Sequence, residues 1–134
     1  MTAYDKALYY LSMREHCRKE LETKLRAKGY NAGEIEAALD RLEEENFLSD
    51  ARYAEVFIRS RLRKNPEGKE IMIMRLIGKG VSPSLARNSV TSYFDENSTE
   101  IEAIYSSLRA KVVSQKGEEK ARAYLFRKGI KFRD

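Results

Sequence analysis

Apolar residues recur at spacings of three and four along most of the chain, a pattern typical of amphipathic helices. Over the first 46 residues this pattern predicts three helices, at about 2–13, 16–28 and 32–46. The apolar residues that carry them are Leu8, Leu11, Leu21, Leu25, Ile35, Leu39 and Leu42. The same spacing predicts further helices at about 50–64, 66–79, 83–95, 99–115 and 117–128. Only two prolines interrupt the chain, which favours an all-α fold.

Capping residues mark several of the expected helix starts. A polar side chain before a helix accepts hydrogen bonds from its first backbone N–H groups, and proline is tolerated in its first turn. On this basis we expect an N-cap at Ser49 or Asp50, and one at Asn31, where Glu34 completes a capping box. We also expect an N-cap at Asn65, with Pro66 as the first helical residue, and one at Ser82 before Pro83.

A Lys-Gly pair followed by an apolar residue occurs three times, in "RAKGY", "IGKGV" and "FRKGI". Glycine accepts the left-handed conformation that ends a helix, and the next apolar residue can fold back on the last turn. The near-equal spacing therefore predicts tandem three-helix repeats over 1–48, 49–97 and 98–134, in an elongated, curved array. The third repeat is expected to be incomplete, with two helices. A phosphate-binding loop is disfavoured, because Gly68-Lys69 lacks the P-loop pattern.

Positive charge is concentrated in the last two-thirds of the chain. Residues 1–48 hold 8 Lys/Arg and 10 Asp/Glu, residues 49–97 hold 9 and 6, and residues 98–134 hold 9 and 5. A basic excess of this extent favours a polyanion or an acidic protein surface as the partner.

Three segments, "ALYYLSMREHCRKELETKLRAKGY", "LEEENFLSDARYAEVFIRSRLR" and "LIGKGV", together resemble the bacterial RecX family of RecA regulators. The resemblance covers nearly the whole chain, and "FLSDARYA" is among its most specific parts. It implies a non-enzymatic protein that binds the RecA filament on DNA, in its helical groove, and suppresses ATP hydrolysis, strand exchange and repressor cleavage. The chain departs from the family pattern at Lys131, which stands where a capping residue is expected, and in its missing last helix.

Two basic clusters are the candidate contacts to DNA or to RecA. Arginine suits both targets because its planar donors bind phosphate and carboxylate groups in pairs. The first cluster comprises Arg52, Arg59, Arg61, Arg63 and Lys64, and Glu55 is spaced to pair with Arg59. The second comprises Lys116, Lys120, Arg122, Arg127, Lys128, Lys131 and Arg133. The alternative explanation is a solvated helix face for the first cluster and an exposed basic tail for the second.

Other functions find less support in the sequence. Most aromatic residues, Phe126 among them, fall in helical apolar patterns, so we expect them to pack rather than to stack on bases. His16 and Cys17 are adjacent and point about 100° apart on a helix, which favours neither a zinc site nor a nucleophile with its base. We therefore expect no catalytic residue, metal or cofactor.

The remaining expectation is a cytoplasmic monomer without a membrane span, whose partners are the RecA filament and single- and double-stranded DNA. The single cysteine agrees with a reducing compartment. The competing hypothesis is a sequence-specific helix-turn-helix DNA-binding protein, because basic three-helix units also describe that class.

Overall fold

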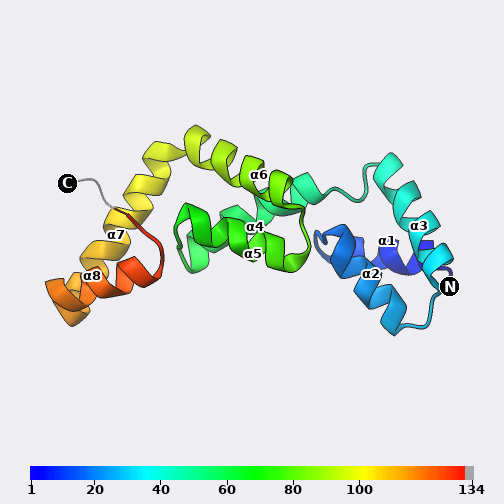
Figure 1. Ribbon diagram of the computed structural model, residues 1–134, viewed down its shortest axis with the longest axis horizontal. Coiled ribbons are helices and arrows are strands. Elements are labelled where there is room, and N and C mark those ends of the chain that lie inside the picture. Colours follow the sequence, from blue (N-terminus) through cyan, green and yellow to red (C-terminus); the bar gives the residue numbers. More distant parts are fainter. Residues whose placement is uncertain (132–134) are drawn as a thin grey trace.

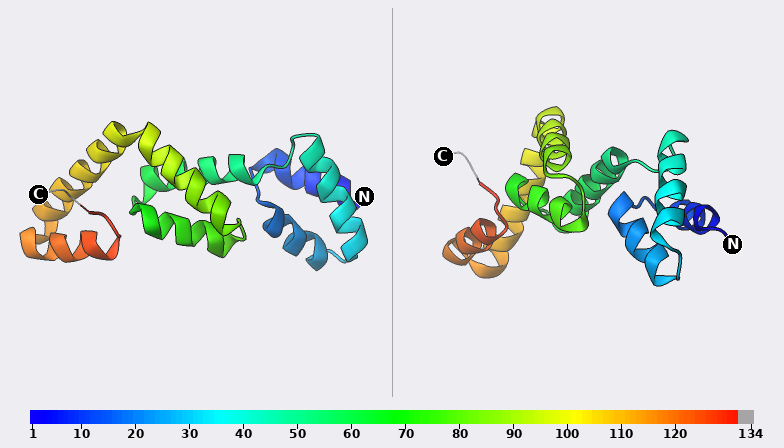
Figure 2. Two further views of the ribbon diagram at one scale, coloured as in Figure 1. Left: turned by 45° about the horizontal axis from the view of Figure 1, so that its top comes forward. Right: turned by 45° about the vertical axis from the view of Figure 1, so that its right-hand side comes forward.

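The computed structural model describes residues 1–131 and places eight α-helices there, in three groups that follow one another along the long axis (Figure 1). The first group is α1 (Ala3–Met13), α2 (Arg18–Ala27) and α3 (Ala32–Glu44); the second is α4 (Asp50–Lys64), α5 (Lys69–Lys79) and α6 (Pro83–Glu96); the third is α7 (Ser98–Lys116) and α8 (Glu118–Arg127). The molecule stays elongated in other views (Figure 2). The predicted all-α fold is confirmed.

Three of the four predicted caps are present, but Glu34 accepts the side-chain amide of Asn31 and not its backbone N–H, so the predicted capping box is not formed. The Ser49 hydroxyl accepts the backbone N–H of Arg52 at 3.1 Å, and the Asn31 side chain accepts that of Glu34 at 2.8 Å. Ser82 caps α6 in the same way. Each bond satisfies one of the N–H groups that a helix start leaves without an intrahelical partner.

The predicted start of α5 at Pro66 is wrong, because α5 begins at Lys69 and its N-cap is Gly68. Two tertiary contacts keep the preceding residues out of the helix. The Glu67 side chain is buried among arginines from α4 and α5, and the backbone N–H of Gly68 donates to the carbonyl oxygen of Lys128 at 2.7 Å. A local capping signal is thus overridden by packing between helices, including one contact to a residue sixty positions away.

The three Lys-Gly turns end helices as the sequence predicts. Gly29, Gly80 and Gly129 have φ values of 93°, 106° and 71°. In each turn the backbone N–H of the apolar residue after the glycine donates to the carbonyl oxygen of a leucine in the last helical turn, at 3.0 to 3.2 Å. This hydrogen bond is characteristic of a Schellman stop. The pairs are Tyr30 with Leu25, Val81 with Leu76, and Ile130 with Leu125.

Two of these turns also join neighbouring groups. The carbonyl oxygen of Lys79 accepts the Cys17 thiol at 3.3 Å, and that of Lys128 accepts the N–H of Gly68. Cys17 and Gly68 occupy the same position, the N-cap of the second helix in their groups. Each turn therefore docks on the start of the middle helix of the preceding group.

The buried apolar residues form two cores. One lies among α1–α3 and the segment that follows α3, and it includes Leu21, Leu39 and Leu48. The other lies within α4–α6 but extends into the third group through Ile101, Tyr105, Leu125 and Ile130. Helices α7 and α8 are thus anchored on the second core, and a domain division at residues 48 and 97 stays a prediction.

Candidate functional site

The exposed cations at the end of α4 are Arg63 and Lys64, which form no ion pair within residues 1–131. Both lie in the last turn of the helix, where the partial negative charge of the backbone carbonyls favours basic side chains. Arg63 and Lys64 also line a groove of about 750 Å³ between the end of α4 and α7. Lys111 and Arg59 line the same groove, which gives it four cations.

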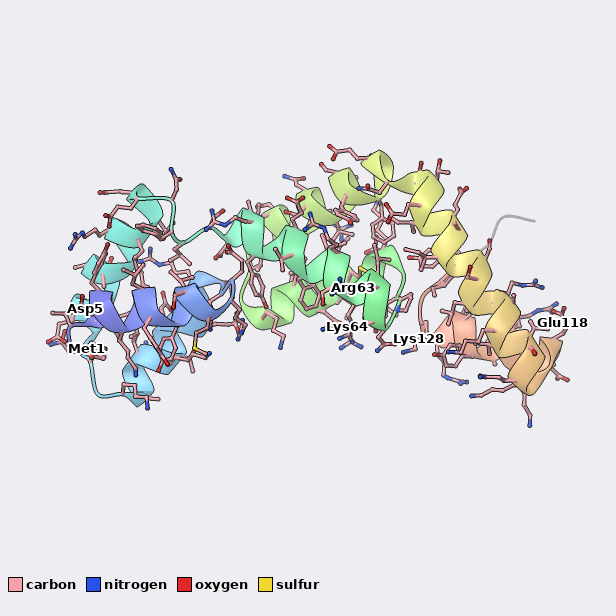
Figure 3. The ribbon with its side chains drawn as sticks, turned by 180° about the vertical axis from the view of Figure 1, so that it is seen from behind. Met1, Asp5, Arg63, Lys64, Glu118 and Lys128 are labelled. Carbon is pink, nitrogen blue, oxygen red and sulfur yellow. The ribbon has the colours of Figure 1, made fainter. Side chains whose placement is uncertain are left out.

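Lys128 brings part of the second cluster to the same place. Its ammonium donates to the side-chain oxygen of Asn65 at 2.8 Å, one residue beyond α4. Figure 3 shows Lys128 beside Arg63 and Lys64, although the chain separates them by more than sixty residues. We call Arg59, Arg63, Lys64, Lys111 and Lys128 the α4–α7 basic surface.

Arg61 does not contribute to this surface, because it forms an internal ion pair. Its Nε lies 2.7 Å from Oε1 of Glu67, whose side chain is only 2% exposed. Arg75 binds the same carboxylate through two nitrogens, at 2.7 and 2.6 Å. Burial acts to raise the pKa of Glu67, but the hydrogen bonds from Arg75 and Arg61 outweigh it, and the pKa lies below its ordinary value. Arg61 and Arg75 thus keep a buried carboxylate ionised.

The other two arginines of the first cluster also have acidic partners. Arg52 pairs with Glu15 at 2.6 Å and donates to the carbonyl oxygen of Phe47, so it bridges the first and second groups. Arg59 pairs with Glu55 at 2.9 Å, as their spacing predicted. The Arg59 pair is exposed on both sides and leaves the guanidinium accessible to a ligand.

The second cluster divides between two sides of α8. Lys116 and Lys128 place their ammonium groups 5.2 and 5.7 Å from the ring centre of Tyr124, within cation–π range. Lys120 and Arg127 are exposed on the same face of α8 as Tyr124, four residues before it and three after it, whereas Arg122 and Lys131 line the groove between α7 and α8. Arg133 lies outside the described residues.

Sequence reasoning missed Lys111 and Arg75. Lys111 is seven residues after Ile104 and shares its face of α7, so a helical projection of 98–116 would have placed it over the groove. Arg75 gave no comparable signal, since its partner Glu67 is buried by tertiary packing.

His16 and Cys17 are both buried and perform structural roles. Burial raises the pKa of the Cys17 thiol to about 11, so the thiol stays protonated near neutral pH and donates to Lys79. Nε2 of His16 accepts a hydrogen bond from the ammonium of Lys24, 2.8 Å away. Nδ1 of His16 donates to the carbonyl oxygen of Arg14, 3.0 Å away. Since an ammonium can only donate, these contacts define a neutral imidazole.

Within residues 1–131, no three acidic, histidine or cysteine side chains lie close enough to hold a metal ion. None of the helices in that range is long and apolar enough to cross a membrane.

Two family models match the chain. Residues 3–42 match the model described as "RecX, first three-helix domain", and residues 49–89 match "RecX, second three-helix domain". These segments correspond to α1–α3 and to α4 with α5 and the first half of α6.

Several curated proteins named "Regulatory protein RecX" are similar to the chain. The protein from Chlorobium phaeobacteroides (strain BS1) is 36% identical over 91 residues, which is 68% of this chain and 60% of that protein. The protein from Clostridium acetobutylicum is 33% identical over 102 residues, or 76% of this chain and 47% of that protein. The chain thus spans about half of the length of such relatives.

Solved structures extend the similarity to the third helical group. The crystal structure of RecX from Lactobacillus salivarius superimposes with a TM-score of 0.79 at 25% identity, over 97% of this chain and 87% of that one. A second crystal structure, of regulatory protein RecX, gives a TM-score of 0.80 at 22% identity, over 96% of this chain and 67% of that one, and supports the fold alone.

Proposed function

Because the chain belongs to the RecX family of regulatory proteins, we propose that it regulates the RecA recombinase by binding along the RecA filament on DNA. In this proposal it acts as a cytoplasmic monomer, lies in the helical groove of the filament, and lowers ATP hydrolysis, strand exchange and repressor cleavage. It needs no catalytic residue or cofactor, because binding alone impedes the filament's cycle.

The observation that carries the proposal is the α4–α7 basic surface. Its five cations come from α4, α7 and the turn after α8, so two helical groups contribute to one face. Arg63 and Lys64 are exposed and not paired within residues 1–131, which leaves their donors available for phosphate or carboxylate groups. A filament of RecA on DNA presents both kinds of group.

The elongated arrangement of the helices supports the same proposal. Repeat-like arrays expose a long surface for their mass, and contacts from successive groups to successive filament subunits reinforce one another through effective concentration. Modest affinity at each contact is then sufficient for tight binding overall.

The test compares two double variants in an assay of RecA ATP hydrolysis on single-stranded DNA. Arg63→Ala with Lys64→Ala removes two exposed cations from the end of α4, and Arg26→Ala with Lys28→Ala removes the same types from the end of α2. We expect the first variant to need a several-fold higher concentration for the same inhibition, and the second to behave like the parent chain. Equal inhibition by all three proteins would exclude the α4–α7 basic surface.

Binding measurements separate the regulator from the helix-turn-helix alternative. Fluorescence anisotropy is recorded with single-stranded DNA, random duplex DNA, and single-stranded DNA coated by RecA with a slowly hydrolysed ATP analogue. We expect the coated strand to bind most tightly. Selection of one duplex sequence, with little dependence on salt, would instead identify a sequence-specific DNA-binding protein.

A further inference from the structure

Phe126 is an exposed aromatic residue, although its place in an apolar pattern predicted packing. Its side chain is 83% exposed, the highest value among the large apolar residues described. The reason is helical geometry: neighbouring residues of α8 are rotated by about 100°, so Leu125 enters the core and Phe126 leaves it. Tyr124 is rotated by about 200° from Phe126, on the opposite side of the helix. The expectation of packing is wrong for Phe126.

The surroundings of Phe126 are cationic. It lines a groove of about 730 Å³ between α7 and α8, together with Arg109, Arg122 and Lys131. Arg122 is four residues before Phe126 and therefore shares its face of α8. Glu118 is the one carboxylate of the groove, and it pairs with Arg109 at 3.0 Å, with both side chains about half exposed or more. Such an exposed pair is weak and is readily replaced by a stronger anion.

This combination of groups fits a single-stranded nucleic acid. A strand offers flat bases for an exposed ring and a phosphate in each step for the cations beside it. An apolar helix from a partner protein fits less well, because three of the groove's side chains are cationic and would be desolvated without full pairing.

We propose that the α7–α8 groove binds a segment of single-stranded DNA or RNA, with one base stacked on Phe126 and the adjacent phosphates at Arg122 and Lys131. The site is separate from the α4–α7 basic surface, because Lys128, which belongs to that surface, lies by Tyr124 on the opposite side of α8. Stacking is tolerant of base identity, so the site has little sequence preference. The inference deepens the proposed function, since it names a nucleic-acid contact of the same protein.

The test uses the full chain without RecA, so its result is independent of the proposed regulation. Binding is measured by anisotropy with labelled oligothymidylate and with an oligonucleotide of the same length made of abasic sites. Phe126→Ala is expected to weaken binding to oligothymidylate roughly fivefold or more, the low end of the effect of losing one stacked base. Its binding to the abasic strand is expected to stay unchanged. Met74→Ala, which removes a 70% exposed side chain from α5, is the matched control.

A second variant provides a spectroscopic readout. The chain has no tryptophan, so Phe126→Trp introduces a single indole at the groove. We expect oligothymidylate to quench its fluorescence and the abasic strand to leave it unchanged. Arg122→Ala should lower the slope of log affinity against log salt by about 0.7, the value for one phosphate contact on a single strand. Phe126→Ala should leave that slope unchanged.

Two outcomes would overturn the proposal. One is equal affinity of Phe126→Ala and the parent chain for oligothymidylate, together with an unquenched indole. The other is that Phe126→Ala no longer binds RecA in the absence of DNA but keeps its affinity for oligothymidylate. The groove would then be a protein contact. In either case inhibition of RecA through the α4–α7 basic surface is still open to its own test. Because Phe126 is so exposed, the variants are expected to melt like the parent chain.

Discussion

The backbone N–H of Gly68 donates a hydrogen bond to the carbonyl oxygen of Lys128, 2.7 Å away. A Cβ atom on Gly68 would overlap the backbone of Gly129, so the two segments approach more closely than any other residue at position 68 allows. This contact seats the turn after α8 on the start of α5. It is what positions Lys128 beside the end of α4.

Gly68→Ala should therefore release α8 from α5. We expect the free energy of unfolding to fall by about 2 kcal/mol, in the range for overpacking of a closely packed site, and amide hydrogen exchange to accelerate in α8. Gly78→Ala is the control, because a Cβ there meets no atom within 4 Å and α5 is helical around it. It should raise stability by about 0.5–1 kcal/mol. Unchanged exchange in α8 of Gly68→Ala would contradict the docking role.

Gly80 and Gly29 provide a comparison between a docked and an undocked turn. Both have positive φ, so replacement by alanine costs each about 1 kcal/mol in backbone strain. A Cβ on Gly80 would also overlap the side chain of Lys19, whereas one on Gly29 meets nothing within 4 Å. Urea unfolding should show a loss of stability for Gly80→Ala that exceeds that of Gly29→Ala by about 1–3 kcal/mol. Equal losses would show that the approach to Lys19 is easily relieved.

Arg75 and Arg59 should differ in their contribution to stability, although each has one acidic partner. Arg75→Ala removes two hydrogen bonds from the buried Glu67 and leaves that carboxylate to Arg61 alone. We expect it to lower the free energy of unfolding by about 1–3 kcal/mol. Arg59→Ala removes an exposed pair and should change stability by about 0.5 kcal/mol or less. Denaturant midpoints measure both, and similar values would contradict the structural role of Arg75.

His16 should make stability depend on pH in the weakly acidic range. Burial, with Arg14 and Lys24 nearby, lowers the pKa of His16 below its ordinary value of 6.5. The unfolded chain therefore binds a proton before the folded one does, and stability decreases as pH falls below about 6.5 until it passes the folded pKa. Since His16 is the single histidine, His16→Gln should flatten this part of the curve. Melting temperatures between neutral and weakly acidic pH provide the measurement; parallel curves for both proteins would argue against the effect.

Much of the fold was predictable because its determinants are local. Helical spacing of leucines, the caps at Asn31, Ser49 and Ser82, and the glycines of the Lys-Gly turns each act over a few residues. The failure at Pro66 has the opposite cause. Its capping signal is as good as that of Pro83, but Gly68 donates to Lys128, and the backbone carbonyl of Glu67 accepts the hydroxyl of Tyr105, both far away in the chain.

The candidate site was less predictable. The spacing of Glu55 and Arg59 identified their pair, because both lie on one helix. Nothing in "RSRLRK" distinguishes Arg61 from Arg63, since the buried partner of Arg61 lies beyond the helix. The apolar pattern likewise predicted that Phe126 packs in the core. The structure shows that Leu125 occupies the inward side of α8, which leaves Phe126 exposed.

The sequence by itself determined the helices, their stops and the basic excess, because hydrophobic periodicity and backbone conformation act between near neighbours. The tertiary structure decided which cations are free to bind a partner. A charge is available or engaged according to which opposite charge lies within hydrogen-bonding distance, and that distance depends on the packing of whole helices. Arg61 is thereby held on Glu67, while Arg63, two residues later, faces the groove.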